Sequence, residues 1–267
     1  MLTINMNTGE GYKELILPDK QPHITLDAGD MDMAVKVICS LSGHPSLKLI
    51  ELCMVAEILN RQKFYWELHI PYLMGARWDR IMPTKYDSFD LKVVANIINS
   101  LKANVVYLYD PHSDVAPALI ENVTVVDNRH LVEAYKEQEA VLIIPDAGAA
   151  KKAFKYAEWN PNIKDFIHCI KHRDPSNGNI TLEVLEPEKS AGRNCVIIDD
   201  ICDGGGTFIQ IANQLGDLPA SLTLIVTHGI FSKGFHDLEN LFDQIITSDS
   251  HQSSYEGKNV KVIPYDY

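Results

Sequence analysis

Short apolar runs recur along the chain and alternate with longer segments in which apolar residues return every three or four positions. The short runs have the length and composition of buried parallel strands, whereas the longer segments have the period of amphipathic helices. Strands and helices that alternate in this way are typical of a doubly wound α/β fold with mainly parallel sheets. The predicted strands span residues 33–39, 64–70, 105–109, 141–144, 165–170, 195–198 and 222–227, and the predicted helices span residues 46–60, 89–102, 131–139 and 149–159.

The pattern also indicates two lobes. One series of strands and helices gives way to a second near residues 128–140, so we expect an N-terminal lobe over residues 1–130 and a C-terminal lobe over residues 131–267. With 267 residues, of which 46% are hydrophobic, the chain is long enough for two modest α/β domains with separate cores.

A glycine-rich segment follows one of the predicted strands, within the stretch CVIIDDICDGGGTFIQIANQL at residues 195–215. A strand that ends at Ile198 and a helix that begins near Thr207 would place the three glycines at 204–206 at the helix N-terminus. Free backbone N–H groups and the helix dipole attract an anion there, and glycine lets the backbone approach it closely. The segment predicts a phosphate site, although it has neither the Lys-Ser/Thr of a Walker A loop nor the spacing of a dinucleotide loop.

Three carboxylates accompany the glycines. Asp199 and Asp200 follow the apolar run directly, and Asp203 precedes the first glycine. Because like charges repel, these side chains do not bind the phosphate itself, but they suit sugar hydroxyls or a metal ion beside it. Together, acids and glycines predict a sugar phosphate site. The alternative is a glycine-rich turn with solvated acids.

Composition limits the partners of the chain. A net charge of -12 argues against nucleic acid and against an anionic membrane, so we expect small-molecule substrates. The five cysteines are scattered and lack C-x-x-C spacing, which argues against a zinc site and a disulfide framework. The first residues do not resemble a signal peptide, and no run of 18 apolar residues occurs. We therefore expect a cytoplasmic protein.

Charged residues follow a second predicted strand, in the segment HIPYLMGARWDR. In open α/β sheets, ligands bind beyond the carboxyl ends of the strands. Arg77, Asp79 and Arg80 come after the strand that ends at Ile70, and guanidinium groups there can grip phosphates or stack on a base. The alternative is a solvated ion-pair loop.

Three further strand ends carry polar residues. YLYDPHSD contains Asp110 and His112, LIIPDAGAAKKA contains Asp146, and IKHRDPSNGN contains Lys171 and Arg173. His112 is either a metal ligand or an ordinary loop histidine, and aspartate is common in turns. Lys171 and Arg173 form either a mobile basic loop with a function or a charged surface.

In their order along the chain, these segments resemble the phosphoribosyl pyrophosphate synthetases, or ribose-phosphate pyrophosphokinases. The resemblance runs from about residues 17–26 to about residues 247–250. VIIDDICDGGGT resembles the ribose-phosphate loop, which type I phosphoribosyltransferases share. PYLMGARWDR is similar to the ATP-site segment, DPHSD to the metal-binding histidine segment, PDAGAAKKA to the metal-binding aspartate segment, and IKHRD to the catalytic loop. The resemblance implies two phosphoribosyltransferase-like lobes.

The resemblance also implies an activity. It implies a ribose-phosphate diphosphokinase-type transferase that moves the β,γ-diphosphoryl group of ATP to the anomeric 1-hydroxyl of ribose 5-phosphate, or of a 5-substituted ribose phosphate such as ADP-ribose, and releases AMP. Mg2+ as cofactor, ATP as co-substrate and a homo-oligomeric assembly come with it. The implied site residues are Lys171 and Arg173 for catalysis, Arg77, Trp78, Asp79, Arg80 and Asp19 for ATP, Asp199, Asp200, Asp203, Gly204, Gly205, Gly206 and Thr207 for the ribose phosphate, and His112 and Asp146 for the metal.

Three positions depart from the pattern of the family. Gly204 stands where the family usually has threonine, which predicts a wider pocket and makes ADP-ribose an acceptor nearly equal to ribose 5-phosphate. Trp78 replaces the usual glutamine of the ATP segment, and Leu17 replaces an aromatic residue that contacts adenine. We expect adenine recognition to be rearranged, with stacking on Trp78 as one route.

Two other functions remain open. A type I phosphoribosyltransferase would use the same acidic loop but needs no ATP-binding segment, so Arg77, Arg80, His112 and Lys171 count against it. The second is a noncatalytic homologue that binds nucleotides and regulates a true synthetase, and the intact Lys171, Arg173, His112 and Asp146 count against it.

Overall fold

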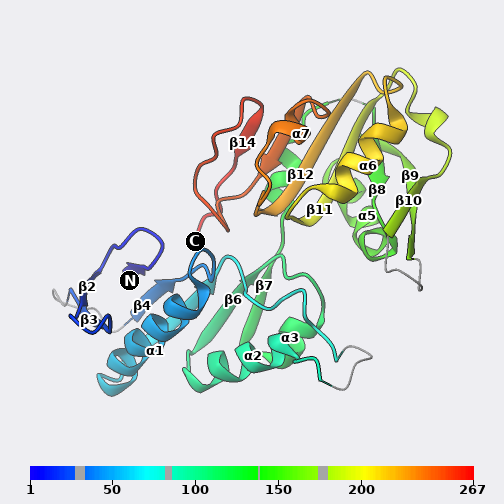
Figure 1. Cartoon of the computed structure of the whole chain (residues 1–267). Helices are drawn as coiled ribbons and strands as arrows, with labels where there is room; N and C mark the ends of the chain where they lie inside the picture. The colour runs from blue at the N-terminus through cyan, green and yellow to red at the C-terminus, as the bar shows by residue number, and fades with distance from the viewer. Residues whose placement is uncertain (28–33, 82–85, 138, 174–179) are drawn as a thin grey trace. The chain divides into compact units, whose positions relative to one another are not determined.

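The computed structural model describes residues 1–27, 34–81, 86–137, 139–173 and 180–267, with the backbone alone for residues 172, 173 and 180. The chain divides into two compact units (Figure 1). Unit 1 comprises Met1–Asp127 and Asp266–Tyr267, and unit 2 comprises Asn128–Tyr265. The division comes just before helix α4 because Leu131 and Val132 of this helix belong to the core of unit 2.

Unit 1 is built on a five-stranded parallel sheet with the strand order β1-β4-β5-β6-β7, accompanied by an antiparallel hairpin, β2-β3. The strands of unit 1 are β1 (Leu2–Asn5), β2 (Tyr12–Ile16), β3 (Pro22–Leu26), β4 (Ala34–Ile38), β5 (Tyr65–Ile70), β6 (Val105–Tyr109) and β7 (Val123–Val126), and its helices are α1 (Pro45–Arg61), α2 (Asp90–Ser100) and α3 (Val115–Leu119).

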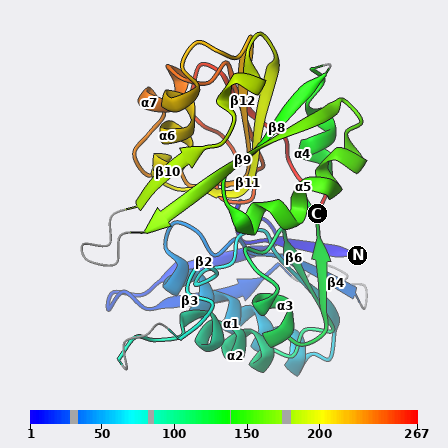
Figure 2. The same cartoon turned by 90° about the vertical axis from the view of Figure 1, so that its right-hand side faces the viewer.

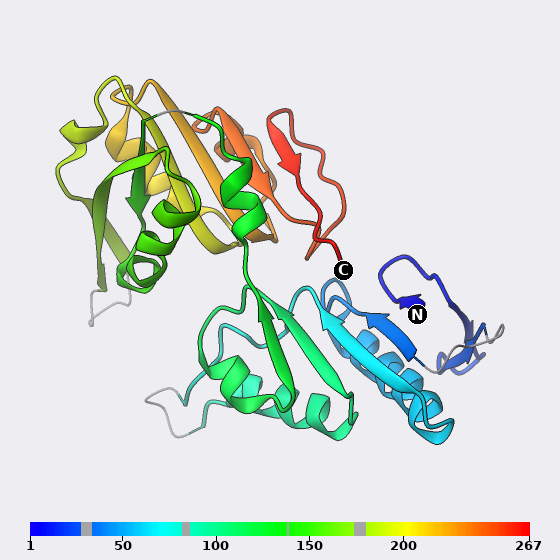
Figure 3. The same ribbon diagram turned by 180° about the vertical axis from the view of Figure 1, so that it is seen from behind.

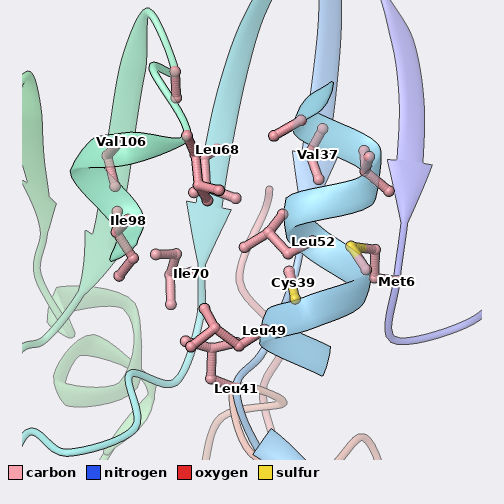
Figure 4. Packing of buried hydrophobic residues seen from close by; sticks show 14 of the residues in the cluster. Met6, Val37, Cys39, Leu41, Leu49, Leu52, Leu68, Ile70, Ile98 and Val106 are labelled. Carbon is pink, nitrogen blue, oxygen red and sulfur yellow. The ribbon is translucent and has the colours of Figure 1, made fainter. Parts of the chain in front are cut away.

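The helices of unit 1 cover one face of its sheet. Figures 1 and 3, which view the chain from opposite sides, show α1, α2 and α3 on the same face. Val37 and Leu68 point from the sheet toward Leu52 of α1 and Ile98 of α2 (Figure 4). Side chains alternate between the two faces of a strand, so residues two apart point to the same face. Ile70 lies two residues after Leu68 and also belongs to the core under the helices.

Helix α1 illustrates how the amphipathic pattern is used. Its residues Leu52, Val55 and Leu59 are buried, while Glu57 and Arg61 form an ion pair one turn apart on the solvent side, with a 2.8 Å distance between Oε1 and Nε. Among the helices that the structure describes, none combines the length and the hydropathy that crossing a bilayer requires.

Unit 2 is built on a seven-stranded sheet with the order β10-β9-β8-β11-β12-β13-β14, in which every neighbouring pair is parallel except β9 and β10. β9 and β10 run side by side as an antiparallel pair at one edge (Figure 2). The elements of unit 2 are α4 (Arg129–Ala134), β8 (Ala140–Ile144), α5 (Ala147–Trp159), β9 (Ile163–Arg173), β10 (Ile180–Val184), a 3-10 turn (Pro187–Ser190), β11 (Asn194–Cys202), α6 (Gly206–Leu215), β12 (Ser221–Gly229), α7 (His236–Glu239), β13 (Gln244–Thr247) and β14 (Val260–Val262).

The sheet of unit 2 is buried on both faces. Cys195 and Ile197 of β11 pack in one hydrophobic cluster with α6, whereas Val196 and Ile198 pack in a second cluster with α4 and α5. A strand covered on both sides reads as a continuous apolar run, which is why residues 195–198 show no polar alternation.

The α/β fold with mainly parallel sheets is confirmed. Several boundaries differ from the sequence prediction. The helix expected over residues 131–139 ends at Ala134, and the strand expected to end at Ile198 continues to Cys202. The strand is longer because β11 keeps pairing with β12 through Ile201 and Cys202.

Asn160 tests the packing of α4 against α5. Its buried Nδ2 donates to the carbonyl oxygens of Val132 and Tyr135, at 3.0 and 2.9 Å. We expect Asn160→Ala to lower the free energy of unfolding by about 2–4 kcal/mol, because two buried acceptors lose their donor. Unfolding in urea, followed by the fluorescence of the adjacent Trp159, measures the loss.

Asn160→Asp keeps the shape but cannot donate when ionised, so it should destabilise at neutral pH and less in acid. Asn240→Ala removes an exposed amide and serves as the control, with an expected change within about 0.5 kcal/mol. Equal stability of Asn160→Ala and Asn240→Ala would contradict the structural role.

Candidate functional site

Three neighbouring strands of unit 2 end beside one another. β8, β11 and β12 are adjacent and parallel, so their carboxyl ends lie at the same edge of the sheet. Asp146 follows β8, the last residues of β11 include Asp199 and Asp200, and a turn over residues 230–235 follows β12. This edge gathers the acidic and glycine-rich segments of the chain.

Asp199 and Asp200 form a crowded carboxylate pair. Asp200 is 8% exposed, and its backbone N–H donates to Oδ1 of Asp199 at 2.9 Å. Burial raises the pKa of Asp199 well above its ordinary value, and the negative charges of Asp200 and Asp146 raise it further. Two acids held together in this way attract a cation or the donor hydroxyls of a ligand.

Asp146 has a structural role that is sufficient to explain an aspartate at this position. It is the N-cap of α5, and its Oδ1 accepts hydrogen bonds from the backbone N–H groups of Gly148 and Ala149, at 2.9 and 3.0 Å. The cap also fixes the carboxylate where its charge acts on Asp199. The sequence prediction of a ligand role for Asp146 therefore stays a prediction.

The three glycines after β11 are glycines for different reasons. Gly205, the N-cap of α6, has a φ of 74°, a backbone conformation that favours glycine. Gly206, the first residue of α6, has no such φ, and a Cβ placed on it would meet nothing within 4 Å. The open space in front of Gly206 is therefore available to a ligand at the helix N-terminus. Asp203 and Thr207, on either side of the glycines, are partly buried.

The space beside Gly204 is occupied. A Cβ on Gly204 would lie 3.2 Å from Cε and 3.3 Å from Cδ of Lys233, a residue in the turn after β12. The sequence predicted a wider pocket at Gly204, but the side chain of Lys233 fills the room that the missing side chain leaves. Lys233 was not identified from the sequence.

Lys171 lies in a strand and not in the basic loop that the sequence predicted. It belongs to β9, where it pairs with Leu182 of β10, and its side chain is exposed. β9 extends to Arg173 because its last residues pair with β10, and this pairing explains why Lys171 lies in a strand. Arg173 ends β9, and its side chain lies outside the described part of the chain, as do residues 174–179.

In unit 1, the segment predicted to bind ATP and the segment that contains His112 lie together. Asp79 is buried and forms a bidentate ion pair with Arg80, with distances of 2.7 and 3.1 Å. The hydrogen bonds from Arg80, joined by one from Ser113 and by the charge of His112, lower the pKa of Asp79 although burial opposes the shift. Asp79 thus links the segment after β5 to the segment after β6.

The remaining residues predicted for ATP lie on the surface of unit 1. Arg77 is exposed, and Trp78 is 50% exposed, so part of this aromatic residue is accessible to a ligand. Asp19 lies in the turn between β2 and β3, where its Oδ1 accepts from the backbone N–H of Gln21 at 3.2 Å. Leu17 belongs to the same turn.

The residues predicted to bind metal are spread over the two units, His112 in unit 1 and Asp146 in unit 2. Within the described ranges, no group of three or more histidine, cysteine or acidic side chains is arranged to hold a metal ion. Mg2+ commonly uses one or two carboxylates together with substrate phosphates and water, so a sparse protein donor set is compatible with it.

Two kinds of residue escaped the sequence analysis. Lys233 lies over Gly204, which is distant in the sequence, so no local motif marks it, whereas Ser113 lies inside the DPHSD segment but was not singled out. A signal existed for Lys233, because a loop after the strand 222–227 was expected at the same edge of the sheet. His228 and Ser250, whose Nδ1 and Oγ are 2.8 Å apart, form a buried polar pair near this edge that was also missed.

Comparison with known proteins gives consistent matches, although no profile of a protein family matches the chain. The chain is 25% identical over 261 residues to a ribose-phosphate pyrophosphokinase of Hyphomonas neptunium, covering 92% of this chain and 82% of the relative. It is 30% identical over 210 residues to the enzyme of that name from Granulibacter bethesdensis, covering 75% of this chain and 66% of the relative.

The fold has a counterpart among solved structures. The crystal structure of phosphoribosylpyrophosphate synthetase from Mycobacterium smegmatis superposes with a TM-score of 0.82 at 18% identity, covering 95% of this chain and 85% of that one. The sequence matches and the shared fold agree with the resemblance of the chain to this family. The chain therefore belongs to the ribose-phosphate pyrophosphokinase family.

Proposed function

We propose that the protein transfers the β,γ-diphosphoryl group of ATP to the anomeric 1-hydroxyl of ribose 5-phosphate, or of a 5-substituted ribose phosphate such as ADP-ribose. The hydroxyl oxygen attacks the β-phosphorus and loses its proton, while the bond from the β-phosphorus to the α,β-bridging oxygen breaks. That oxygen leaves with AMP. The protein needs no nucleophile of its own.

The observation that carries this proposal is the arrangement at the end of β11 in unit 2. The crowded acids Asp199 and Asp200 lie directly before a glycine loop with open space at Gly206. Carboxylates accept hydrogen bonds from sugar hydroxyls, and the N-terminus of α6 attracts a phosphate. We assign the ribose hydroxyls to Asp199 and Asp200, and the 5-phosphate to residues 203–207.

Unit 1 supplies the residues proposed for ATP. Arg80 is already fixed by Asp79, so its guanidinium is held in one orientation on the surface. Arg77 and Arg80 are assigned to the phosphates, and Trp78 to the adenine, which its exposed ring could stack upon. Asp19 is assigned to the nucleotide only through the resemblance of its segment to the family.

Magnesium is the proposed cofactor. His112 and Asp146 are each proposed to contact it, and the ion would neutralise charge on the ATP phosphates when bound. The N-cap bonds hold Asp146, and the contacts around Asp79 lie beside His112.

Lys171 and Arg173 are proposed to stabilise the transferring group. Phosphoryl transfer depends mainly on positioning and on neutralising charge that develops in the transition state. The exposed Lys171 side chain, on an edge pair of strands, is available for such a contact.

A direct assay tests the function. Incubation with ATP, magnesium and either acceptor should release AMP in a 1:1 ratio with consumed acceptor, for ribose 5-phosphate, ADP-ribose or both. The ratio of kcat/KM values identifies the preferred acceptor. If no acceptor yields AMP, the pyrophosphokinase proposal fails, and a phosphoribosyltransferase or a regulatory homologue takes its place.

Lys171→Ala tests the catalytic assignment. We expect kcat to fall about 100-fold or more while the KM for ATP changes by less than about 3-fold, because the ammonium acts chiefly in the transition state. Lys164→Ala is the matched control, since Lys164 is an exposed lysine near the start of the same strand. Steady-state kinetics measures both variants, and a loss of ATP affinity at unchanged kcat would refute the role.

Asp199→Asn tests the electrostatics of the acid pair. Because the pKa of Asp199 is raised in the folded protein, folding loses stability as pH rises from the unfolded pKa through the folded one. Removing the charge should therefore raise the Tm of the ligand-free protein by about 2–4 °C at pH 7–8, and by little near pH 4.

The same variant should weaken the acceptor without weakening ATP, as the KM values for the two substrates would report. A Tm that falls at neutral pH, or equal damage to both substrates, would count against the assignment of Asp199 to the ribose.

A further inference from the structure

We propose that Lys233 is a binding residue for the acceptor: its ammonium binds the phosphoryl group held at the glycine loop, and the missing side chain of Gly204 leaves the space in which the Lys233 side chain lies. The inference rests on the proposed function, because it deepens the acceptor site of unit 2. The ligand chemistry is a phosphoryl group attached to O5 of a ribose, whether terminal or continued into a diphosphate.

The turn that carries Lys233 is fixed against the strand that carries the acids. The backbone N–H groups of Ile230 and Phe231 donate to the carbonyl oxygen of Cys202, at 2.9 and 3.1 Å. The N–H of Ser232 donates to the carbonyl oxygen of Asp203 at 3.1 Å. Lys233 therefore projects from a turn whose backbone is hydrogen-bonded to the two residues just before Gly204.

Side chains hold the same turn in shape. The ring of Phe231 packs against Phe235 and Tyr255, with centroid distances of 4.6 and 5.3 Å. Phe231 has a φ of 47°, which is unfavourable for a bulky residue and persists only where the surroundings fix it. The position of the Lys233 backbone is thus determined by packing as well as by hydrogen bonds.

The Lys233 side chain lies over Gly204 along much of its length. A Cβ on Gly204 would be 3.6, 3.3 and 3.2 Å from Cγ, Cδ and Cε of Lys233. The ammonium is one C–N bond beyond Cε, so it must lie near the glycine loop. Gly204 has no φ in the left-handed region, so the contact, rather than the backbone conformation, explains the glycine.

The charge of Lys233 is opposite to that of the acidic residues around it. The nearby strand ends carry Asp146, Asp199, Asp200 and Asp203, all of which repel a phosphoryl group. Across the residues that the structure describes, Lys233 makes no ion pair, and its side chain is exposed. The positive charge of Lys233 offsets the repulsion between these acids and a phosphoryl group, which the N-terminus of α6 would otherwise have to offset alone.

The first experiment removes the charge and keeps the length. Binding of ribose 5-phosphate and of ADP-ribose is measured by calorimetry without ATP, for the parent, Lys233→Met and the control Lys164→Met. We expect the Kd of the bound acceptor to rise about 10-fold in Lys233→Met and to lose much of its dependence on salt, with little change in Lys164→Met.

The second experiment tests the pairing of Lys233 with Gly204. In the parent, Gly204→Thr should displace the lysine and weaken the acceptor. In a Lys233→Ala background, the same change should be neutral or beneficial, because the space is free and the threonine hydroxyl can donate to the phosphoryl group. A reversal of sign between the two backgrounds is the expected result.

The outcomes separate this inference from the proposed function. If ATP yields AMP but Lys233→Met binds the acceptor like Lys164→Met, the function stands and the inference is wrong. If no AMP forms with any acceptor while Lys233→Met still weakens phosphate-ester binding, the inference stands without the activity. Equal effects of Gly204→Thr in both backgrounds, or no binding of either ester by the parent, would overturn it.

Discussion

The close approach of Asp199 and Asp200 at the end of β11 is the constraint on which the site depends. Burial and mutual repulsion make this acid pair unfavourable in the ligand-free protein. The continuous apolar run before it, buried on both faces of the sheet, holds the pair in place. The packing of the core thus holds the two acids in an unfavourable arrangement that a ligand can stabilise by hydrogen bonds or positive charge.

The surrounding elements follow from the same edge of the sheet. Parallel neighbours bring the ends of β8 and β12 beside β11, so the charge of Asp146 acts on Asp199 and the side chain of Lys233 lies over Gly204, although both come from separate parts of the sequence. Acidic side chains come before the glycine loop in the sequence, whereas Lys233 and the N-terminus of α6 supply positive charge beside it. A molecule with both hydroxyls and a phosphoryl group matches this division.

Much of this arrangement could be predicted from the sequence, because it depends on local signals. The apolar run at 105–109 is strand β6, and the acids and glycines after residue 198 mark the proposed phosphate loop. Contacts between distant segments could not be predicted. Lys233 fills the space beside Gly204, and Lys171 lies in a strand because β10 pairs with β9. The residues next to each lysine in the sequence indicate neither contact.

The fate of the β-phosphorus of ATP tests the central claim most directly. With ATP carrying a radioactive label at the β-phosphorus, the account predicts that all transferred label appears in a diphosphate on C1 of the acceptor and none in the AMP. Label that remains in ADP, or that appears as free inorganic diphosphate without a modified sugar, would contradict it.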